Sequence, residues 1–97
     1  MIASFGNRAT EDLYHGRKSK ASRRLPPDIV PGALRKLDMI NAAQSLQDLT
    51  SPPGNRLEAL HGNLSGHHSI RINDQWRIVF RWSACEAHSV RIVDYHS

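Results

Sequence analysis

The spacing of apolar residues in this chain changes at residues 51–54, whose sequence is Ser-Pro-Pro-Gly. Before this break, Val30, Leu34, Leu37 and Ile40 recur at the three- and four-residue spacing of one helix face. After it, apolar and polar residues alternate, as they do in a strand that is buried on one side. Because prolines and glycine interrupt regular elements, the sequence predicts helices before the break and strands after it.

The first part of the chain carries the start signals of two helices. Asn7 is a suitable N-cap for one helix, and a second helix is expected from about Ile29. Pro31 is tolerated in the first turn of the second helix, where no intrahelical N–H donor is needed. The apolar residues 2–5 precede both helices and predict a strand at the edge of a sheet.

Alternating stretches predict the strands of the second half. They cover residues 68–72, 76–82 and 90–95, and a shorter alternation of Leu57, Ala59 and His61 precedes them. Arginine recurs on the face opposite the apolar one. We therefore expect an α+β fold, with two N-terminal helices packed on one face of a small, mainly antiparallel sheet whose other face is open.

Length and composition limit the class of protein. A chain of 97 residues has room for one core, so we expect one domain over residues 1–97. No apolar run approaches the roughly 20 residues of a membrane span, and no signal-peptide segment is evident, so we expect a cytoplasmic chain. Cys85 is the one cysteine, and we interpret it as an incidental turn residue rather than a nucleophile. We expect no cofactor, and no metal at His67 and His68, which lack further ligands at suitable spacing.

Positive charge is concentrated before residue 41. The formal net charge is +4, and basic and acidic residues balance in the second half. Five basic residues fall within eight positions: Arg17, Lys18, Lys20, Arg23 and Arg24. Such a run indicates either a solvated surface or a contact with a phosphate backbone, and the sequence favours neither.

The second half contains the side chains that metal-free RNA cleavage requires. That reaction needs a base for the 2′-hydroxyl, a cation for the charge that builds on the phosphate, and an acid for the leaving oxygen. Histidine serves either proton role near neutral pH, and arginine pairs bidentately with phosphate. The candidates are His61, His96, Glu58, Asp94, Arg71, Arg77, Arg81, Arg91 and Tyr95. Each also has a structural interpretation, because polar residues line the free face of many antiparallel sheets.

Three motifs occur in order along the second half. They are Leu-x-x-Leu-x-Gly-x-x-x-Gly at residues 57–66, Trp-Arg-Ile-x-Phe at residues 76–80 and Asp-Tyr-His at residues 94–96. With these motifs, nearly the whole chain resembles the HigB-type toxins, the killer-protein branch of the RelE-like superfamily. The resemblance implies a RelE-like fold and a ribosome-dependent endonuclease that cuts mRNA in the A site without a metal.

The resemblance also implies roles for particular residues. His96 would be the principal acid or base, and Arg77 would stabilise the phosphate. Tyr95 would contact the substrate base or orient the phosphate, and Asp94 would hold a neighbouring group in place. The basic residues of the first half would bind ribosomal RNA. The implied partners are the ribosome, mRNA, a helix-turn-helix antitoxin of the HigA type and, through that antitoxin, operator DNA.

One position departs from the pattern of the family. Some relatives carry a second active-site histidine where this chain has Glu58, and a histidine follows here as His61. Either residue would serve as the base, and we expect the difference to alter the rate or pH dependence and to give a weak nuclease. The alternatives are a non-catalytic regulator that binds ribosomes or RNA, and an inhibitor of DNA gyrase, against which the Asp-Tyr-His ending argues.

Overall fold

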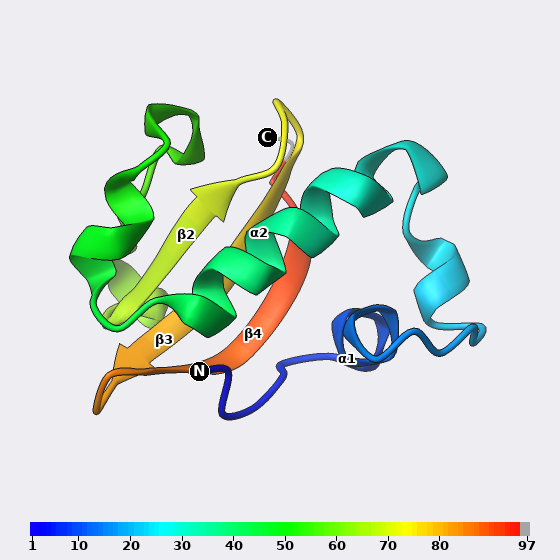
Figure 1. Cartoon of the computed structure of the whole chain (residues 1–97), viewed down its shortest axis with the longest axis horizontal. Helices are drawn as coiled ribbons and strands as arrows, with labels where there is room; N and C mark the ends of the chain where they lie inside the picture. The colour runs from blue at the N-terminus through cyan, green and yellow to red at the C-terminus, as the bar shows by residue number, and fades with distance from the viewer. Residues whose placement is uncertain (96–97) are drawn as a thin grey trace.

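The computed structural model describes residues 1–95. In chain order its elements are α1 (Arg8–Tyr14), the 3-10 turns η1 (Ser22–Arg24) and η2 (Pro27–Ile29), α2 (Val30–Ala42), the 3-10 turns η3 (Leu46–Thr50) and η4 (Pro53–Asn55), β1 (Glu58–Ala59), η5 (Gly62–Leu64), β2 (His67–Arg71), β3 (Trp76–Ser83) and β4 (Glu86–Asp94) (Figure 1). Two helices precede the strands, as the change of apolar spacing predicts.

The four strands form one antiparallel sheet in the order β1-β2-β3-β4. The β2–β3 hairpin pairs Arg71 with Arg77, so residues 73–75 make the predicted turn. The predicted N-terminal edge strand is reduced to two isolated parallel bridges, Ile2 with Ala87 and Phe5 with Val90. These bridges cover the free edge of β4.

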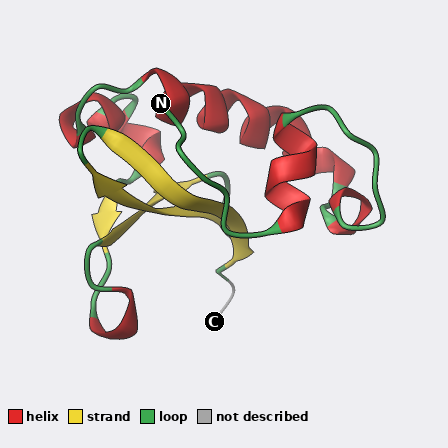
Figure 2. Ribbon diagram, turned by 90° about the horizontal axis from the view of Figure 1, so that it is seen from below, coloured by secondary structure: helices red, strands yellow, loops and turns green. Residues whose placement is uncertain are grey.

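Helix α2 lies across one face of the sheet, and α1 lies beside β4 (Figures 1 and 2). The buried side of α2 carries Ala33, Leu37 and Ile40, which pack with Ile78 and Phe80 from the sheet. All five are fully buried. The expected α+β arrangement, with helices on one face and strands beneath, is therefore confirmed. No helix within residues 1–95 has the length and apolar content needed to cross a bilayer.

Helix α1 is joined to the sheet by polar contacts. Asn7 caps it as expected, because its Oδ1 accepts from the backbone N–H of Thr10 at 2.9 Å. The Oγ1 of Thr10 in turn accepts from the backbone N–H of Ile92 at 2.8 Å. Asp12 is also buried, and a hydrogen bond from the Ser19 side chain lowers its pKa, with neighbouring arginines acting in the same direction.

The strand expected from Leu57 is shorter than the alternation predicts. β1 contains only Glu58 and Ala59, and the buried residue of this segment is Leu60, whereas Ala59 and His61 are exposed. The left-handed backbone of Arg56, with φ of 45°, turns the chain two residues before the strand begins. The segment therefore contributes one short edge strand to the sheet.

Candidate active site

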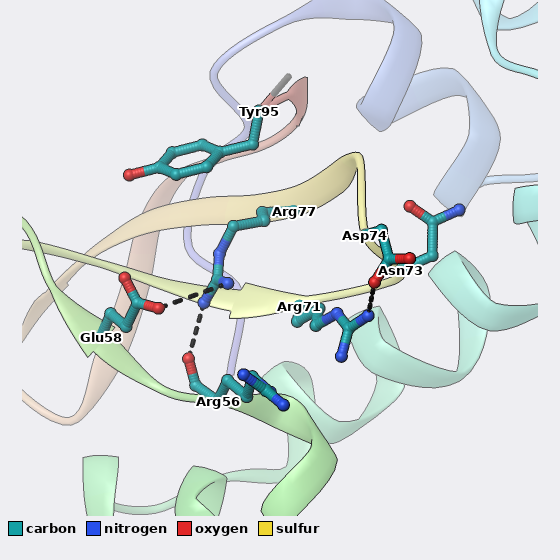
Figure 3. Close-up of a pocket in the computed structure, with 7 residues that line it drawn as sticks. All are labelled: Arg56, Glu58, Arg71, Asn73, Asp74, Arg77 and Tyr95. Atoms are coloured by element: carbon teal, nitrogen blue, oxygen red, sulfur yellow. Dashed lines mark hydrogen bonds and ion pairs between the residues drawn. The ribbon is translucent and has the colours of Figure 1, made fainter. Parts of the chain in front are cut away.

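A hollow opens on the face of the sheet opposite α2. Its volume is about 270 Å³. The lining side chains are Arg56, Glu58, Arg71, Asn73, Asp74, Arg77 and Tyr95 (Figure 3). They come from the segment before β1, from β1, from the β2–β3 hairpin and from the residue that follows β4. Side chains far apart in the sequence therefore meet at one end of the sheet.

Arg77 lies at the centre of this hollow. Only 7% of its surface is exposed, whereas the sequence suggests an open polar face. Its Nε donates to the Oγ of Ser69 at 2.8 Å, and its Nη2 donates to the carbonyl oxygen of Arg56 at 2.6 Å. A longer bond of 3.4 Å joins Nη2 to the Ser69 carbonyl. A buried charge needs such partners, so these bonds explain how Arg77 is accommodated.

Glu58 faces the remaining terminal nitrogen of Arg77. Its Oε1 lies 3.5 Å from Nη1, and 53% of the Glu58 side chain is exposed against 8% for Arg77. The carboxylate is therefore more exposed than the buried Ser69, and its contact is longer than the hydrogen bonds that Arg77 donates. An anion that enters the hollow would compete with Glu58 for Nη1 more readily than with Ser69 or Arg56.

Tyr95 covers Arg77 from the solvent side (Figure 3). The guanidinium carbon lies 5.5 Å from the centre of the ring, within the range of a cation–π contact. The Tyr95 backbone N–H donates to the carbonyl of Gln75 at 2.6 Å, which continues the β3–β4 pairing beyond the strand. Because 47% of Tyr95 is exposed, its ring is available to a planar ligand.

The segment before β1 is anchored in the core. Asn55 is fully buried and donates to the carbonyls of Leu49 and Ser51, at 3.2 and 3.4 Å. Lys36 of α2 donates to the Asn55 side chain, and burial lowers the pKa of this lysine. These contacts place Arg56, whose carbonyl then accepts from Arg77. The helical layer and the hollow are thus connected.

Positive charge exceeds negative charge around the hollow. Arg56, Arg71 and Arg77 line it, against Glu58 and Asp74. Arg71 pairs with Asp74, whose side chain is almost wholly exposed. Solvent screening weakens so exposed a pair. The hollow is therefore suited to an anionic ligand.

Comparisons with known proteins identify the family of the chain. A family model described as the RelE-like toxin of the type II toxin–antitoxin system HigB matches residues 3–96. Toxin HigB-1 of Vibrio cholerae serotype O1 is 43% identical over 82 residues, which cover 84% of this chain and 84% of that protein. The chain belongs to the HigB family of RelE-like toxins.

One further protein is similar in sequence, and one solved structure is similar in fold. An uncharacterized protein of Haemophilus influenzae is 36% identical to this HigB-family toxin over 74 residues, covering 76% of the chain and 72% of the relative. The YoeB–YefM complex from Staphylococcus aureus contains a chain of similar fold, with a TM-score of 0.58, 21% identity and coverage of 100% of this chain and 99% of that one. This likeness confirms the RelE-like fold.

Membership of the family carries a general function. The protein is a type II toxin, and such a toxin has a cognate antitoxin as its partner. HigB and RelE-like toxins are generally ribonucleases.

The hollow of this HigB-family toxin brings together four of the residues selected from its sequence: Glu58, Arg71, Arg77 and Tyr95. Asp94 lies outside the lining, and its Oδ2 accepts from the Gln75 side chain at 3.1 Å. His61 is exposed at the start of η5 and does not line the hollow. His96 lies outside the described residues.

The two remaining arginines of the sheet lie further from the hollow. Arg81 is exposed in β3 and pairs in register with His67 and His88. Arg91 donates to the Ser89 carbonyl at 3.0 Å. Neither arginine lines the hollow, although both lie on strands of the same sheet.

The basic run of residues 17–24 belongs to the helical side of the molecule. Its last residues form η1, which packs against α1. Ser19 and Ser22 each accept from the other's backbone N–H at 3.0 Å, and Arg17 pairs with the buried Asp12. Lys18, Lys20, Arg23 and Arg24 are exposed. The run is thus a separate cationic surface from the hollow.

Sequence reasoning missed Ser69, Asn55 and the backbone of Arg56. Alternation in β2 places Ser69 on the same face as Arg71, but no pattern indicates that its hydroxyl reaches Arg77. Among residues 1–95, no group of three or more His, Cys, Asp and Glu side chains is arranged to hold a metal ion. His67 and His68 begin β2 as expected, and burial is the larger of two causes that lower the pKa of His68.

Proposed function

We propose that this toxin is a ribosome-dependent mRNA endonuclease that cuts in the A site without a metal. The observation that carries the proposal is the guanidinium of Arg77, held by Ser69 and Arg56 in a hollow where arginines outnumber carboxylates. A cation held in place before substrate arrives stabilises developing charge without reorganisation during the reaction.

The reaction begins at the 2′-hydroxyl of the nucleotide before the cut. The 2′-oxygen loses its proton to a base and bonds to the adjacent phosphorus, and the 5′-oxygen leaves with a proton from an acid. The product fragment carries a 2′,3′-cyclic phosphate. Arg77 stabilises the charge on the phosphate oxygens, which is the role of a preorganised guanidinium.

Glu58 is the proposed base, because it lies next to Arg77 and is open to solvent. His61 is the weaker candidate, since it lies away from the hollow. His96 is the proposed acid. The proposed role of Asp94 is to hold a neighbouring group in place. Tyr95 stacks on a substrate base or orients the phosphate, for which its exposed ring is suited.

The other arginines extend the proposed RNA surface. Arg56 and Arg71 contact neighbouring phosphates from the rim of the hollow, and Arg81 and Arg91 continue this contact along the sheet. Residues 17–24 bind ribosomal RNA from the helical side. In the cytoplasm, a helix-turn-helix antitoxin of the HigA type neutralises the toxin, and the complex binds operator DNA through the antitoxin.

Primer extension on mRNA from a translating extract tests the proposal. We expect cuts at codon-dependent positions with wild-type toxin, and none when ribosomes are omitted. His96→Ala and Arg77→Ala should each reduce cutting by at least about a hundredfold, the usual cost of removing a central catalytic group. Equal cutting by wild type and both variants contradicts the assigned roles.

A second function is favoured by the ion pair between Glu58 and Arg77. If the carboxylate neutralises the guanidinium throughout, the protein binds ribosomes as a regulator without cleaving mRNA. Ribosome co-sedimentation with no cut in the primer-extension assay distinguishes this regulator from a nuclease.

A further inference from the structure

Ser69 makes the most enclosed of the contacts with Arg77. It is fully buried in β2, and its Oγ accepts from Nε at 2.8 Å while its carbonyl accepts from Nη2 at 3.4 Å. In register, Ser69 lies between Glu58 and Val79, whereas Arg77 lies opposite Arg71. The side chain of Arg77 therefore reaches diagonally across the hairpin to Ser69, a distance that long side chains span.

This diagonal contact fixes the plane of the guanidinium. An arginine side chain has several rotatable bonds, and holding it still costs rotamer entropy. Contacts at Nε and Nη2 together define both the position and the rotation of the planar group, which a contact to one nitrogen does not. Nη1 is then directed toward Glu58 and the hollow.

Serine is an unusual choice for this position if packing is its only role. Buried strand positions favour β-branched and aromatic residues, and a buried hydroxyl is unfavourable unless it is hydrogen-bonded. The described partner of the Ser69 hydroxyl is Arg77. The residue therefore contributes to the geometry of the hollow rather than to the apolar core.

We propose that Ser69 is a positioning residue, which orients Arg77 so that Nη1 meets the phosphate that is cut. This inference rests on the proposed nuclease function. Ser69 does not touch the substrate. It acts through Arg77, so its loss lowers the rate of the chemical step more than it lowers binding.

The test compares an isosteric pair, Ser69→Thr and Ser69→Val, which differ in the hydroxyl but have the same shape. Ser69→Ala is the simplest deletion, and Ser83→Ala in β3 is the control at an exposed serine. Thermal unfolding of each variant establishes that it is folded. Cleavage is followed in a single turnover on ribosomes programmed with one A-site codon, over a range of toxin concentrations.

We expect Ser69→Ala and Ser69→Val to cut at saturation roughly tenfold to a hundredfold more slowly, as for loss of a hydrogen bond to a charged group. The half-saturating toxin concentration should stay within about twofold, and Ser69→Thr should be faster than Ser69→Val by roughly tenfold. The Nε–H resonance of Arg77 in ¹⁵N spectra should exchange slowly in wild type and Ser69→Thr, and rapidly in Ser69→Ala.

Two results overturn the inference while leaving the nuclease proposal intact. One is a cleavage rate of folded Ser69→Ala equal to that of wild type, while Arg77→Ala is inactive. The other is an equal rate for the Thr and Val variants. If wild type itself does not cut, the nuclease proposal fails, and the Nε–H resonance still decides whether Ser69 holds Arg77.

Discussion

The guanidinium carbon of Arg77 lies 5.5 Å from the centre of the Tyr95 ring. Arg77 belongs to β3, and Tyr95 follows the end of β4, so the contact depends on the pairing of these two strands. The ring thereby shields the buried cation, while 47% of Tyr95 remains exposed. A base that enters the hollow would meet both the ring and the charge beneath it.

Replacement of Tyr95 separates the role of its ring from that of its hydroxyl. Tyr95→Ala should weaken RNA binding roughly tenfold, because stacking of one base on an aromatic ring contributes about 1–3 kcal/mol. Tyr95→Phe keeps the ring and should bind within about threefold of wild type. Filter binding to a short single-stranded RNA measures both. If Tyr95→Phe weakened RNA binding as much as Tyr95→Ala, the effect would belong to the hydroxyl and not to the ring.

Arg56 offers a way to separate a backbone role from a side-chain role. Its φ of 45° is a left-handed conformation that glycine adopts freely, so Arg56→Gly should keep the carbonyl on Arg77 and stabilise the fold by about 1 kcal/mol. RNA binding should weaken because one phosphate contact is removed. For the same reason, the slope of the logarithm of the binding constant against the logarithm of the salt concentration should become shallower by about one unit. Thermal unfolding and a salt titration of binding test this. Unchanged binding would exclude a phosphate contact by this side chain.

Thr10 should be important for stability although it is far from the hollow. Thr10→Val has the same shape but leaves the buried N–H of Ile92 without its described acceptor, at a cost of about 1–3 kcal/mol. Thr50→Val is the control, since Thr50 is exposed and should change stability by less than about 0.5 kcal/mol. Urea unfolding measures both. Equal effects would show that the Thr10 bond contributes little.

Asp12 should make stability depend on acid pH. Its pKa in the folded chain lies below the ordinary value of 3.8, chiefly because of the Ser19 hydrogen bond. Near and below pH 3.8 the unfolded chain therefore binds more protons than the folded chain. The contribution of Asp12 to the free energy of unfolding is complete above that pH and is lost as pH falls through the folded pKa.

Urea unfolding between pH 2 and pH 6 tests this dependence. Asp12→Asn should be less stable than wild type at pH 6, and the difference should shrink toward pH 2. Asp28→Asn is the control, because Asp28 is exposed. A difference that stays constant over this range would contradict a lowered pKa for Asp12.

Local patterns in the sequence predict most of the fold. The N-cap of Asn7, the start of α2 near Pro31 and the β2–β3 turn each depend on neighbouring residues, and the structure confirms them. The alternation after Leu57 predicts the wrong burial pattern. An arginine at position 56 does not indicate the left-handed turn that the chain makes there.

The hollow is less predictable because its contacts cross between strands. Residue chemistry makes Arg77 and Tyr95 candidates and the family resemblance implies their roles, but their proximity depends on the register of β3 with β4. Alternation assigns Arg77 to a polar face but does not show that it is buried or that Ser69 holds it. Such a contact depends on rotamers and strand register together, which apolar spacing does not determine.

Arg77 is the residue on which the proposed function depends most. The most direct measurement is the single-turnover rate of mRNA cleavage on ribosomes programmed with one A-site codon. Wild type, Arg77→Ala and the control Arg35→Ala, at an exposed arginine of α2, are compared. We predict a loss of about a hundredfold to a thousandfold for Arg77→Ala, a change of less than about twofold for Arg35→Ala, and a 2′,3′-cyclic phosphate on the product. Equal rates for Arg77→Ala and wild type would contradict the account.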